Sequence, residues 1–383
     1  MKITGVTGTL VNSGWRKNFL FVKVETDAGI TGWGEAYTQV DRERTVATQV
    51  EELGRYAVGR SPFAIKHFTQ MVYNDFAGRR ASMELASAQS AIEMALWDIV
   101  GRALEQPVYN LLGGPCCEAI RVYANGWYTH LETAREYADE AHRMVGLGFD
   151  AIKFDPFPNP WRTFISRRHE DHAVAVVEAV RQAVGPGVDL LLEFQRRLAP
   201  MHAIRVAERV EKFQPYWLEE PCPIDNLDAI AEVRTATSIP IVTGEALYSK
   251  AGYWPLLEKR ATDIINPDVC CVGGILELKE IAAMAEPCLV AVSPHNFNST
   301  TLGLAATVHA SAVMSNFIIT EYFVPFEAVG KEICPDGLVL ENGTIRLPEG
   351  PGLGVDIDEA TLAHHPYRAF EERRLRQPRD EGP

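Results

Sequence analysis

Three glutamates stand at regular intervals in the middle of the chain, and together they could hold a metal ion. Glu193, Glu219 and Glu245 each end or closely follow a short apolar run, and each lies 26 residues after the one before. Brought together, three carboxylates would repel one another and retain protons. A hard divalent cation relieves that repulsion, and Mg²⁺ fits oxygen donors of this kind best. We interpret the three as metal ligands, against the alternative that each caps a helix or pairs with an arginine.

A histidine and an aspartate at similar positions could form an acid–base pair. His295 follows one apolar run, and Asp268 follows the run before it. A carboxylate that accepts a hydrogen bond from an imidazole fixes the tautomer of the ring, and such a histidine beside a metal is a good general base. Lys153 and Glu321 stand at the ends of two further runs. Lys153 could neutralise a substrate carboxylate, or else pair with Asp155 or with one of the metal-side glutamates.

Eight apolar, β-rich runs account for the positions of these residues. They alternate with amphipathic stretches typical of helices, as a (β/α)8 barrel requires. The runs cover residues 121–124, 151–154, 189–194, 216–218, 239–243, 263–266, 289–293 and 317–320. In such a barrel the carboxyl ends of the strands form one rim, and that rim carries the active site. A doubly wound open sheet is the alternative, but the GxGxxG turn that would mark its ligand site is missing from the sequence.

The segments on either side of the barrel predict a second domain. Strand-like runs at 3–10, 19–25 and 30–35 and helical patterns at 42–58, 61–76 and 82–106 precede the barrel. We divide the chain into an N-terminal α+β capping domain (1–118), a catalytic barrel (119–325) and a C-terminal segment (326–383). The C-terminal segment is expected to pack back on the capping domain, because neither piece carries a full core alone.

Composition narrows the choice of partners. The chain has 383 residues and a net charge of −14. This charge argues against nucleic acid or an anionic membrane as the main partner, since both need a basic surface. No run of about 18 apolar residues is present, so no transmembrane helix is expected. The seven cysteines form no CxxC pair and no signal peptide is recognisable, which predicts a cytoplasmic protein without disulfides or a zinc ribbon.

Taken together, the motifs resemble the enolase superfamily, in its mandelate racemase/muconate lactonizing enzyme branch, over essentially the whole chain. They are GWGEA (32–36), ALWDI (95–99), LLGG (111–114), WLEEP (217–221), GE (244–245), NPD (266–268), GG (273–274), SPH (293–295) and PGLGV (351–355). Within the branch, VYANGWY (122–128) and IKFDPF (152–157) are most similar to gluconate and galactonate dehydratases. The resemblance implies an α/β fold, a modified TIM barrel with an α+β capping domain that the C-terminal tail completes.

The resemblance also implies catalytic roles. The residues that match the family's Mg²⁺ ligands are Glu193, Glu219 and Glu245. His295 with Asp268 matches the dyad that removes the proton next to the substrate carboxylate, and Lys153 is expected beside them. Glu321 matches a carboxyl that, when protonated, donates a hydrogen bond to the resulting enediolate. In a dehydratase the enediolate expels the β-hydroxyl, and the enol tautomerises to a 2-keto-3-deoxy acid.

The substrate implied by this resemblance is a small sugar acid of the aldonate type, such as gluconate or galactonate. The residues expected to contact it are Asp155, Gln195, Asn125, Trp15 and Arg16. Trp15 and Arg16 belong to the polar loop 12–18, which closes over the substrate in this fold. Family members are commonly symmetric assemblies, so a homo-oligomer is expected.

Two departures from the family pattern bear on the reaction. Racemases of the branch often carry Lys-x-Lys on the second strand, where this chain has Lys153 and Asp155, so a second lysine base is missing. The related dehydratases carry a histidine where this chain has Gln195. We therefore expect His295 to take the α-proton and return it to the leaving hydroxyl on the same face. Epimerisation or lactone cycloisomerisation through the same enediolate, and a non-catalytic metal-binding relative, are the alternatives.

Overall fold

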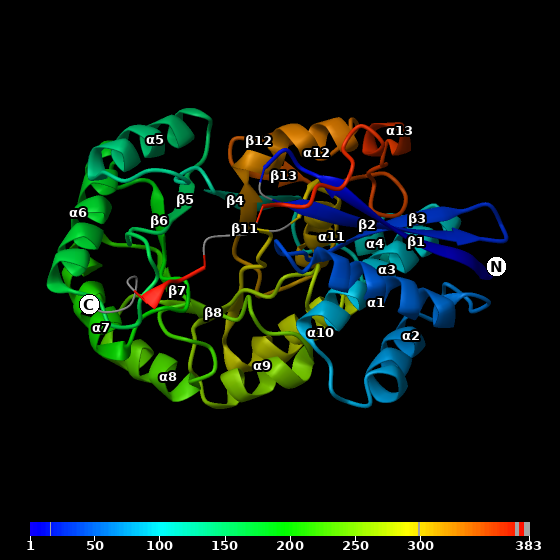
Figure 1. Cartoon of the computed structure of the whole chain (residues 1–383), viewed down its shortest axis with the longest axis horizontal. Helices are drawn as coiled ribbons and strands as arrows, with labels where there is room; N and C mark the ends of the chain where they lie inside the picture. Colours follow the sequence, from blue (N-terminus) through cyan, green and yellow to red (C-terminus); the bar gives the residue numbers. More distant parts are fainter. Residues whose placement is uncertain (16, 298, 372–374, 379–383) are drawn as a thin grey trace.

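The centre of the molecule is a closed barrel of parallel strands, so the fold class predicted from the sequence is confirmed. The computed structural model describes residues 1–15, 17–297, 299–371 and 375–378, and in them eight strands pair in chain order (Figure 1). They are β4 (Ala119–Asn125), β5 (Ala151–Phe154), β6 (Asp189–Glu193), β7 (Trp217–Glu219), β8 (Ile241–Thr243), β9 (Ile264–Ile265), β10 (Ala291–Val292) and β11 (Thr320–Phe323). The barrel closes because β11 pairs in parallel with β4 and Val292 bridges Phe317.

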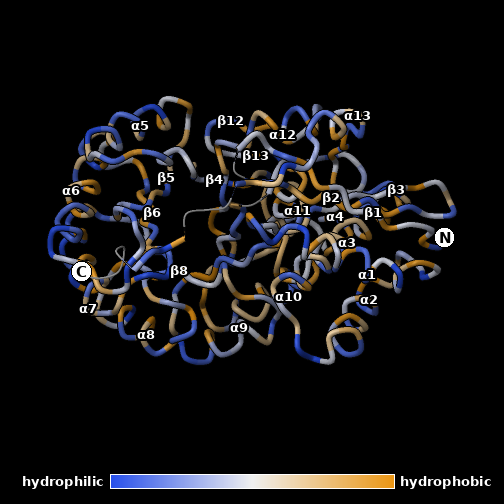
Figure 2. Tube along the Cα trace, in the orientation of Figure 1, coloured by the Kyte–Doolittle hydropathy of each residue, from blue (hydrophilic) through white to orange (hydrophobic). Residues whose placement is uncertain are grey.

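One helix follows each of the first seven barrel strands and covers the outside of the barrel. These helices are α5 (Ala134–Gly146), α6 (Arg167–Val184), α7 (Pro200–Val210), α8 (Leu227–Ala236), α9 (Ser249–Glu258), α10 (Ile275–Ala285) and α11 (Thr301–Ser311). Figure 2 shows hydrophobic and hydrophilic turns alternating along α5, α6 and α7, as expected for helices that bury one face. Among the described helices, none combines the length and the apolar character that a membrane span requires.

The interior of the barrel is filled by side chains rather than by solvent. Tyr123, Leu191, Trp217, Val242 and Ile319 are all buried and pack together inside the strands. The Nε1–H of Trp217 donates a hydrogen bond to Oε2 of Glu219 at 3.0 Å. The packed layer therefore supports the polar rim directly above it.

The last barrel strand differs from the prediction. The apolar run at 317–320 was expected to form it, but the ladder with β4 runs from Thr320 to Phe323. Phe317 only bridges Val292, so this run enters the barrel before the pairing begins. Glu321 consequently lies within β11, opposite Tyr123, rather than beyond the end of the strand.

The capping domain is a three-stranded antiparallel sheet packed against helices. Its elements are β1 (Ile3–Asn12), β2 (Asn18–Thr26), β3 (Thr31–Ala36), α1 (Glu43–Ala57), α2 (Ile65–Met71), α3 (Met83–Ala103) and α4 (Val108–Leu111). The helical pattern predicted for 61–76 is divided between α2 and a π-helical turn, η1 (Val72–Phe76). This domain lies beside the barrel, to the right in Figure 1.

The C-terminal segment contacts both domains. Its elements are α12 (Glu327–Ile333), β12 (Leu340–Glu341), β13 (Thr344–Arg346) and α13 (Glu359–Leu362). β13 pairs antiparallel with the barrel strand β4. Further along, the backbone N–H of Leu353 donates to Asp98 of α3 at 2.9 Å. The division of the chain at residues 118 and 325 stays a prediction.

The sheet of the capping domain sits unusually close to α3. At Gly32 and Gly34 in β3, an added Cβ would lie far inside contact distance of the backbone oxygens of Ala95 and Ala91. Backbone atoms cannot move aside as a flexible side chain can. Glycine is therefore required here by space, at the point where β3 leads towards the barrel.

Replacing Gly34 should unfold the protein more easily. Gly34→Ala forces β3 away from α3, and we expect the free energy of unfolding to fall by about 3 kcal/mol, as for overpacking of a tight core. Chemical denaturation measures it. Gly187→Ala is the matched control, because a Cβ there meets nothing within 4 Å, and it should change stability by less than about 0.5 kcal/mol. Equal effects of the two substitutions would contradict the close packing.

Candidate active site

The three glutamates predicted as metal ligands come together at the rim of the barrel. Glu193 ends β6 and lies directly opposite Glu219, which ends β7, while Glu245 follows β8. One carboxylate oxygen of each lies within 4.8 Å of the others. Glu193 and Glu219 are fully buried and Glu245 nearly so. Three buried oxygen donors at this separation form a set that suits a hard divalent cation.

Lys153 sits among these carboxylates at the end of β5. Its Nζ lies 2.7 Å from Oε1 of Glu219, 3.5 Å from Oε2 of Glu193 and 3.7 Å from Oε1 of Glu321. Burial alone would lower the pKa of Lys153, but the carboxylates raise it well above its usual range. Lys153 is thus held as a cation, in the metal-side pairing that the sequence left open.

Glu193 is the least satisfied of the three glutamates. Its Oε1 accepts a hydrogen bond from the backbone N–H of Gln195 at 2.6 Å, but its Oε2 has no hydrogen-bond partner among the described residues. Burial and the neighbouring Glu219 raise the pKa of Glu193 well above its usual range. Lys153 lies 3.5 Å from this oxygen without bonding to it, so Glu193 keeps unsatisfied negative charge that a bound cation would neutralise.

Arg196 is a functional residue that the sequence reasoning missed. Its guanidinium pairs with Glu245 and lies 3.4 Å from Oε2 of Glu220. Burial opposes ionisation of Glu245, but Arg196 and then His295 lower its pKa to about 2. Gln195 and Arg196 both have a left-handed backbone, with φ of 54° and 57°. Such non-glycine residues cost about 1–3 kcal/mol each and cluster at active sites.

The predicted histidine–aspartate pair is formed. Nδ1 of His295 lies 2.7 Å from Oδ2 of Asp268, whose Oδ1 accepts a hydrogen bond from the N–H of Cys270 at 2.8 Å. Nε2 of His295 faces the site, 3.1 Å from Oε2 of Glu245 and 3.6 Å from Oε2 of Glu321. Burial opposes protonation, but these carboxylates raise the pKa of His295 to about 9.

Glu321 is oriented by groups from two neighbouring strands. The amide of Asn125, at the end of β4, donates to its Oε1, and the backbone N–H of Asn296 donates to its Oε2 at 2.9 Å. Lys153 also approaches Oε1. Asn125 therefore holds Glu321 at the end of β4, and its contact with substrate stays a prediction.

Asp155 pairs with a second arginine. The guanidinium of Arg197 bonds Oδ2 of Asp155 and lies 5.4 Å from the ring centroid of Phe157 and 5.0 Å from that of Trp161. Oδ1 of Asp155 accepts a hydrogen bond from the N–H of Phe157 at 2.9 Å. Both charged side chains are almost fully buried. Asp155 thus fixes the loop after β5, and its contact with substrate stays a prediction.

A cavity of about 930 Å³ lies between the capping domain and the barrel, and Arg196, which pairs with Glu245, connects its lining to the carboxylate cluster. Trp15 lines it and packs against Phe323 and Phe326, with ring centroids 5.7 and 5.5 Å away. Arg16, the other predicted residue of this loop, lies outside the described residues. Arg196 and residues 368–371 also line the cavity. The contribution of the C-terminal tail could not be read from local sequence.

The charge of the cavity lining differs from that of the whole protein. The described titratable residues that line it are Lys17, His130, Arg196, Arg368 and Glu371. The chain as a whole carries a net charge of −14. Cations outnumber anions in this lining, but Arg196 is already paired with Glu245 and Lys17 lies close to Glu35, so Arg368 is the described lining cation with the least internal compensation.

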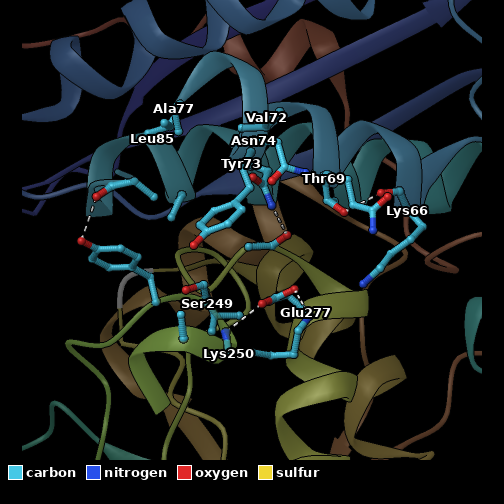
Figure 3. Close-up of a pocket in the computed structure, with 18 residues that line it drawn as sticks. Lys66, Thr69, Val72, Tyr73, Asn74, Ala77, Leu85, Ser249, Lys250 and Glu277 are labelled. Atoms are coloured by element: carbon cyan, nitrogen blue, oxygen red, sulfur yellow. Dashed lines mark hydrogen bonds and ion pairs between the residues drawn. The ribbon is translucent and has the colours of Figure 1, made fainter. Parts of the chain in front are cut away.

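A second cavity, of about 390 Å³, lies behind the site where η1 and α3 face α9 and α10 (Figure 3). Lys250 points across it and pairs with Glu277, with 2.7 Å between Nζ and Oε2. None of the three clustered glutamates lines this space. The convergent titratable groups are therefore at the barrel mouth and not here.

Comparison with known proteins agrees with the architecture. The chain matches the family description "Enolase C-terminal domain-like" over residues 136–361 and "Mandelate racemase / muconate lactonizing enzyme, N-terminal domain" over residues 8–113. It is 37% identical over 370 residues to a D-galactonate dehydratase of Ralstonia pickettii, covering 94% of each chain. It is 36% identical over 359 residues to a D-gluconate dehydratase of Thermoproteus tenax, covering 93% of this chain and 71% of that protein.

The solved structures show the same likeness. The mandelate racemase/muconate lactonizing enzyme from Sulfitobacter sp superposes with a TM-score of 0.91 at 30% identity. The match covers 98% of this chain and 99% of that chain. It therefore includes the capping domain, the barrel and the rim that carries the glutamates.

Breaking the buried pair beside the site should destabilise the protein. Asp155→Asn leaves Arg197 buried without its counter-charge, and we expect the free energy of unfolding to fall by roughly 3 kcal/mol. Denaturant unfolding measures this. Asp171→Asn removes a half-exposed partner of Arg209 and should cost less than about 1 kcal/mol. An Asp155 variant of native stability would instead favour a role in contacting substrate.

Proposed function

The chain belongs to the mandelate racemase / muconate lactonizing enzyme family of the enolase superfamily, and on that premise we propose that it is a Mg²⁺-dependent dehydratase of an aldonate, such as gluconate or galactonate. A sugar acid dehydratase is a hydro-lyase. The observation that carries the proposal is that Glu193, Glu219 and Glu245 gather within 4.8 Å of one another directly beside the His295–Asp268 pair, with Nε2 of His295 3.1 Å from Oε2 of Glu245. Metal-binding oxygens beside a base are the arrangement that removal of a proton next to a carboxylate requires.

The glutamate cluster supports the metal. The three buried carboxylates are faced by Lys153 and, at Glu245, by Arg196, so negative charge remains in excess, and Oε2 of Glu193 has no hydrogen-bond partner in the described chain. Mg²⁺ prefers such oxygen donors. When bound, Mg²⁺ would neutralise the substrate carboxylate and the charge that develops on it. Lys153 partly neutralises the negative charge of Glu219 and Glu193.

His295 is the proton carrier in the proposed reaction. Glu245 contributes to the raised pKa of His295, and a cation held by Glu245 would offset that contribution and favour the neutral ring. With Asp268 holding the Nδ1–H, Nε2 of the neutral ring accepts the α-proton and the C–H electron pair forms the enediolate. That pair then forms the carbon–carbon double bond as the bond to the β-hydroxyl breaks. The imidazolium returns its proton to the leaving oxygen, and water departs. The enol left behind tautomerises to the 2-keto-3-deoxy acid.

The neighbouring groups orient the acid and stabilise charge. Glu321, held by Asn125 and by the backbone of Asn296, lies on the same side as Nε2 of His295. In its protonated form it would donate a hydrogen bond to the enediolate. Gln195 cannot supply a proton at neutral pH, so the proposed route uses a single acid–base group and removes the proton and hydroxyl from one face.

The cavity supports a polyhydroxylated acid as substrate. Its lining combines basic groups with the indole rings of Trp15 and Trp161 and the polar side chains of Thr38 and Gln39. Amide and hydroxyl groups bond to sugar hydroxyls, while the basic groups favour the acid's charge. The named substrates of the relatives, D-galactonate and D-gluconate, have this chemistry.

Metal binding should depend on Glu193. We expect Glu193→Gln to weaken Mg²⁺ binding at least tenfold, because one of three anionic oxygen donors is lost. Isothermal titration calorimetry on the metal-stripped protein measures it. Asp268→Asn is the matched control, since Asp268 is buried in the same site but lies outside the cluster. It should keep affinity within about threefold, and an unchanged affinity in Glu193→Gln would contradict the assignment.

Activity should appear in a screen for 2-keto acids. Purified protein with Mg²⁺ is tested against a stereochemically complete set of aldonic, aldaric and uronic acids, and we expect product from at least one aldonate. His295→Asn should lower kcat about 1000-fold, as for loss of a general acid–base group. Substantial turnover by that variant would refute the single-group route. Exchange of the α-proton with solvent deuterium without keto product would indicate an epimerase or cycloisomerase, and no exchange at all a non-catalytic protein.

A further inference from the structure

A buried carboxylate of the capping domain reaches the start of the barrel helix α11. Glu35 lies in β3 and is fully buried. Its carboxylate accepts hydrogen bonds from the backbone N–H of Thr300 at 2.9 and 3.0 Å, from the Thr300 hydroxyl at 2.8 Å and from the N–H of Gly303 at 3.0 Å. These donors begin α11, the barrel helix that follows the strand carrying His295. Glu35 thus joins two segments that are 265 residues apart.

Hydrogen bonds link the start of α11 to the catalytic groups. The hydroxyl of Ser299, next to Thr300, donates to the side-chain oxygen of Asn296. Asn296 follows His295 directly, and its backbone N–H donates to Glu321 at 2.9 Å. The backbone between His295 and α11 is therefore held at both ends. Glu321 and the barrel hold one end, and Glu35 holds the other.

Glu35 also faces the loop that covers the cavity. Lys17, in that loop, is buried, and its Nζ lies 4.8 Å from the ring centroid of Phe19. Burial raises the pKa of Glu35 to about 7 and Lys17 opposes this, while burial lowers the pKa of Lys17 to about 7 against Glu35. The backbone N–H of Lys17 donates to the oxygen of Trp15 at 2.6 Å. The same carboxylate therefore interacts with both the covering loop and the helix behind the dyad.

We propose that Glu35 is a positioning residue for His295, a capping-domain carboxylate that fixes the start of α11 and with it the backbone that carries the dyad. The proposal deepens the proposed dehydratase reaction and rests on it for its kinetic test. Helix N-terminal N–H groups that are buried need an acceptor, and a carboxylate is the strongest one available. A displacement of about 1 Å of a catalytic group can cost 100-fold in rate.

The test compares Glu35 with a carboxylate of the same kind that lacks this connection. Asp98 is also a buried capping-domain carboxylate that accepts backbone hydrogen bonds, from Trp33 at 3.1 Å and Leu353 at 2.9 Å. Its partners lie in β3, in the C-terminal segment and in α3 itself, where Arg102 pairs with it at 3.0 Å, and none of them belongs to the start of α11. Glu35→Gln and Asp98→Asn therefore both lose a buried charge, but only the first loosens the helix behind His295.

We expect Glu35→Gln to lower kcat at least tenfold with KM within about threefold, whereas Asp98→Asn keeps kcat within about threefold. Hydrogen–deuterium exchange of the substrate-free full chain provides the second readout. Backbone amides of residues 299–304 should exchange at least fivefold faster in Glu35→Gln and at the wild-type rate in Asp98→Asn. An unchanged kcat, or unchanged exchange at these amides, would overturn the proposal.

Two other outcomes, a Glu35 variant that does not fold and a wild-type protein without activity, still allow the proposal to be tested. If Glu35→Gln does not fold, Thr300→Val removes one of the four hydrogen bonds to Glu35, together with the Thr300 cap on the backbone N–H of Leu302 at 3.4 Å. The amide of Gly303, which donates to Glu35 itself, is therefore the one to follow. The Thr300 variant should lower kcat about threefold and speed the same exchange, and no change in either would refute the proposal. If the wild-type protein dehydrates no acid, the proposed function fails, and the exchange comparison alone then decides whether Glu35 holds α11.

Discussion

The concentration of buried negative charge at the barrel mouth is the constraint on which the site depends. Glu193, Glu219, Glu245, Asp268 and Glu321 converge from adjacent strand ends. The described cations among them are Lys153, Arg196 and, when protonated, His295. Taking so many carboxylates out of water is costly unless each has a counter-charge or hydrogen bonds. Part of this cost is offset because the pKa values of Glu193 and His295 are raised, and a cation bound by the three glutamates would offset more of it.

The same need to satisfy buried carboxylates ties the capping domain to the rest of the chain. Glu93 of α3 accepts hydrogen bonds from the N–H groups of Ile275 and Leu276, which begin α10, at 2.7 and 2.9 Å. Burial raises its pKa to about 7. Glu35 does the same at α11, and Asp98 holds the C-terminal segment. Since α10 and α11 follow the strands that carry Asp268 and His295, the interface between the domains and the geometry of the dyad are set together.

The sequence predicted which charged side chains come together where they recur at the ends of regularly spaced strands. Carboxylates at the ends of successive apolar runs located the glutamate cluster, because strand ends in a parallel barrel must share a rim. The sequence was less informative where a turn of the backbone determines the direction in which a side chain points. Arg196 and Arg197 are neighbours, yet the left-handed turn sends one to Glu245 and the other to Asp155. Contacts between residues far apart in the sequence, such as Glu35 with Thr300 or residues 368–371 at the cavity, produce no periodic pattern in the sequence.

The side chains that could donate or accept a proton in the site restrict the possible routes for loss of water. Lys153 is surrounded by three carboxylates that raise its pKa and favour its cationic form. Gln195 has no proton to give, and its backbone N–H is engaged by Glu193. Among the described groups facing the cluster, His295 has an imidazole nitrogen aimed inward and a partner that fixes the other nitrogen. If water is to be lost here, the nitrogen that accepts the proton is also the one placed to return it. The missing histidine then changes the face from which the hydroxyl leaves rather than the reaction.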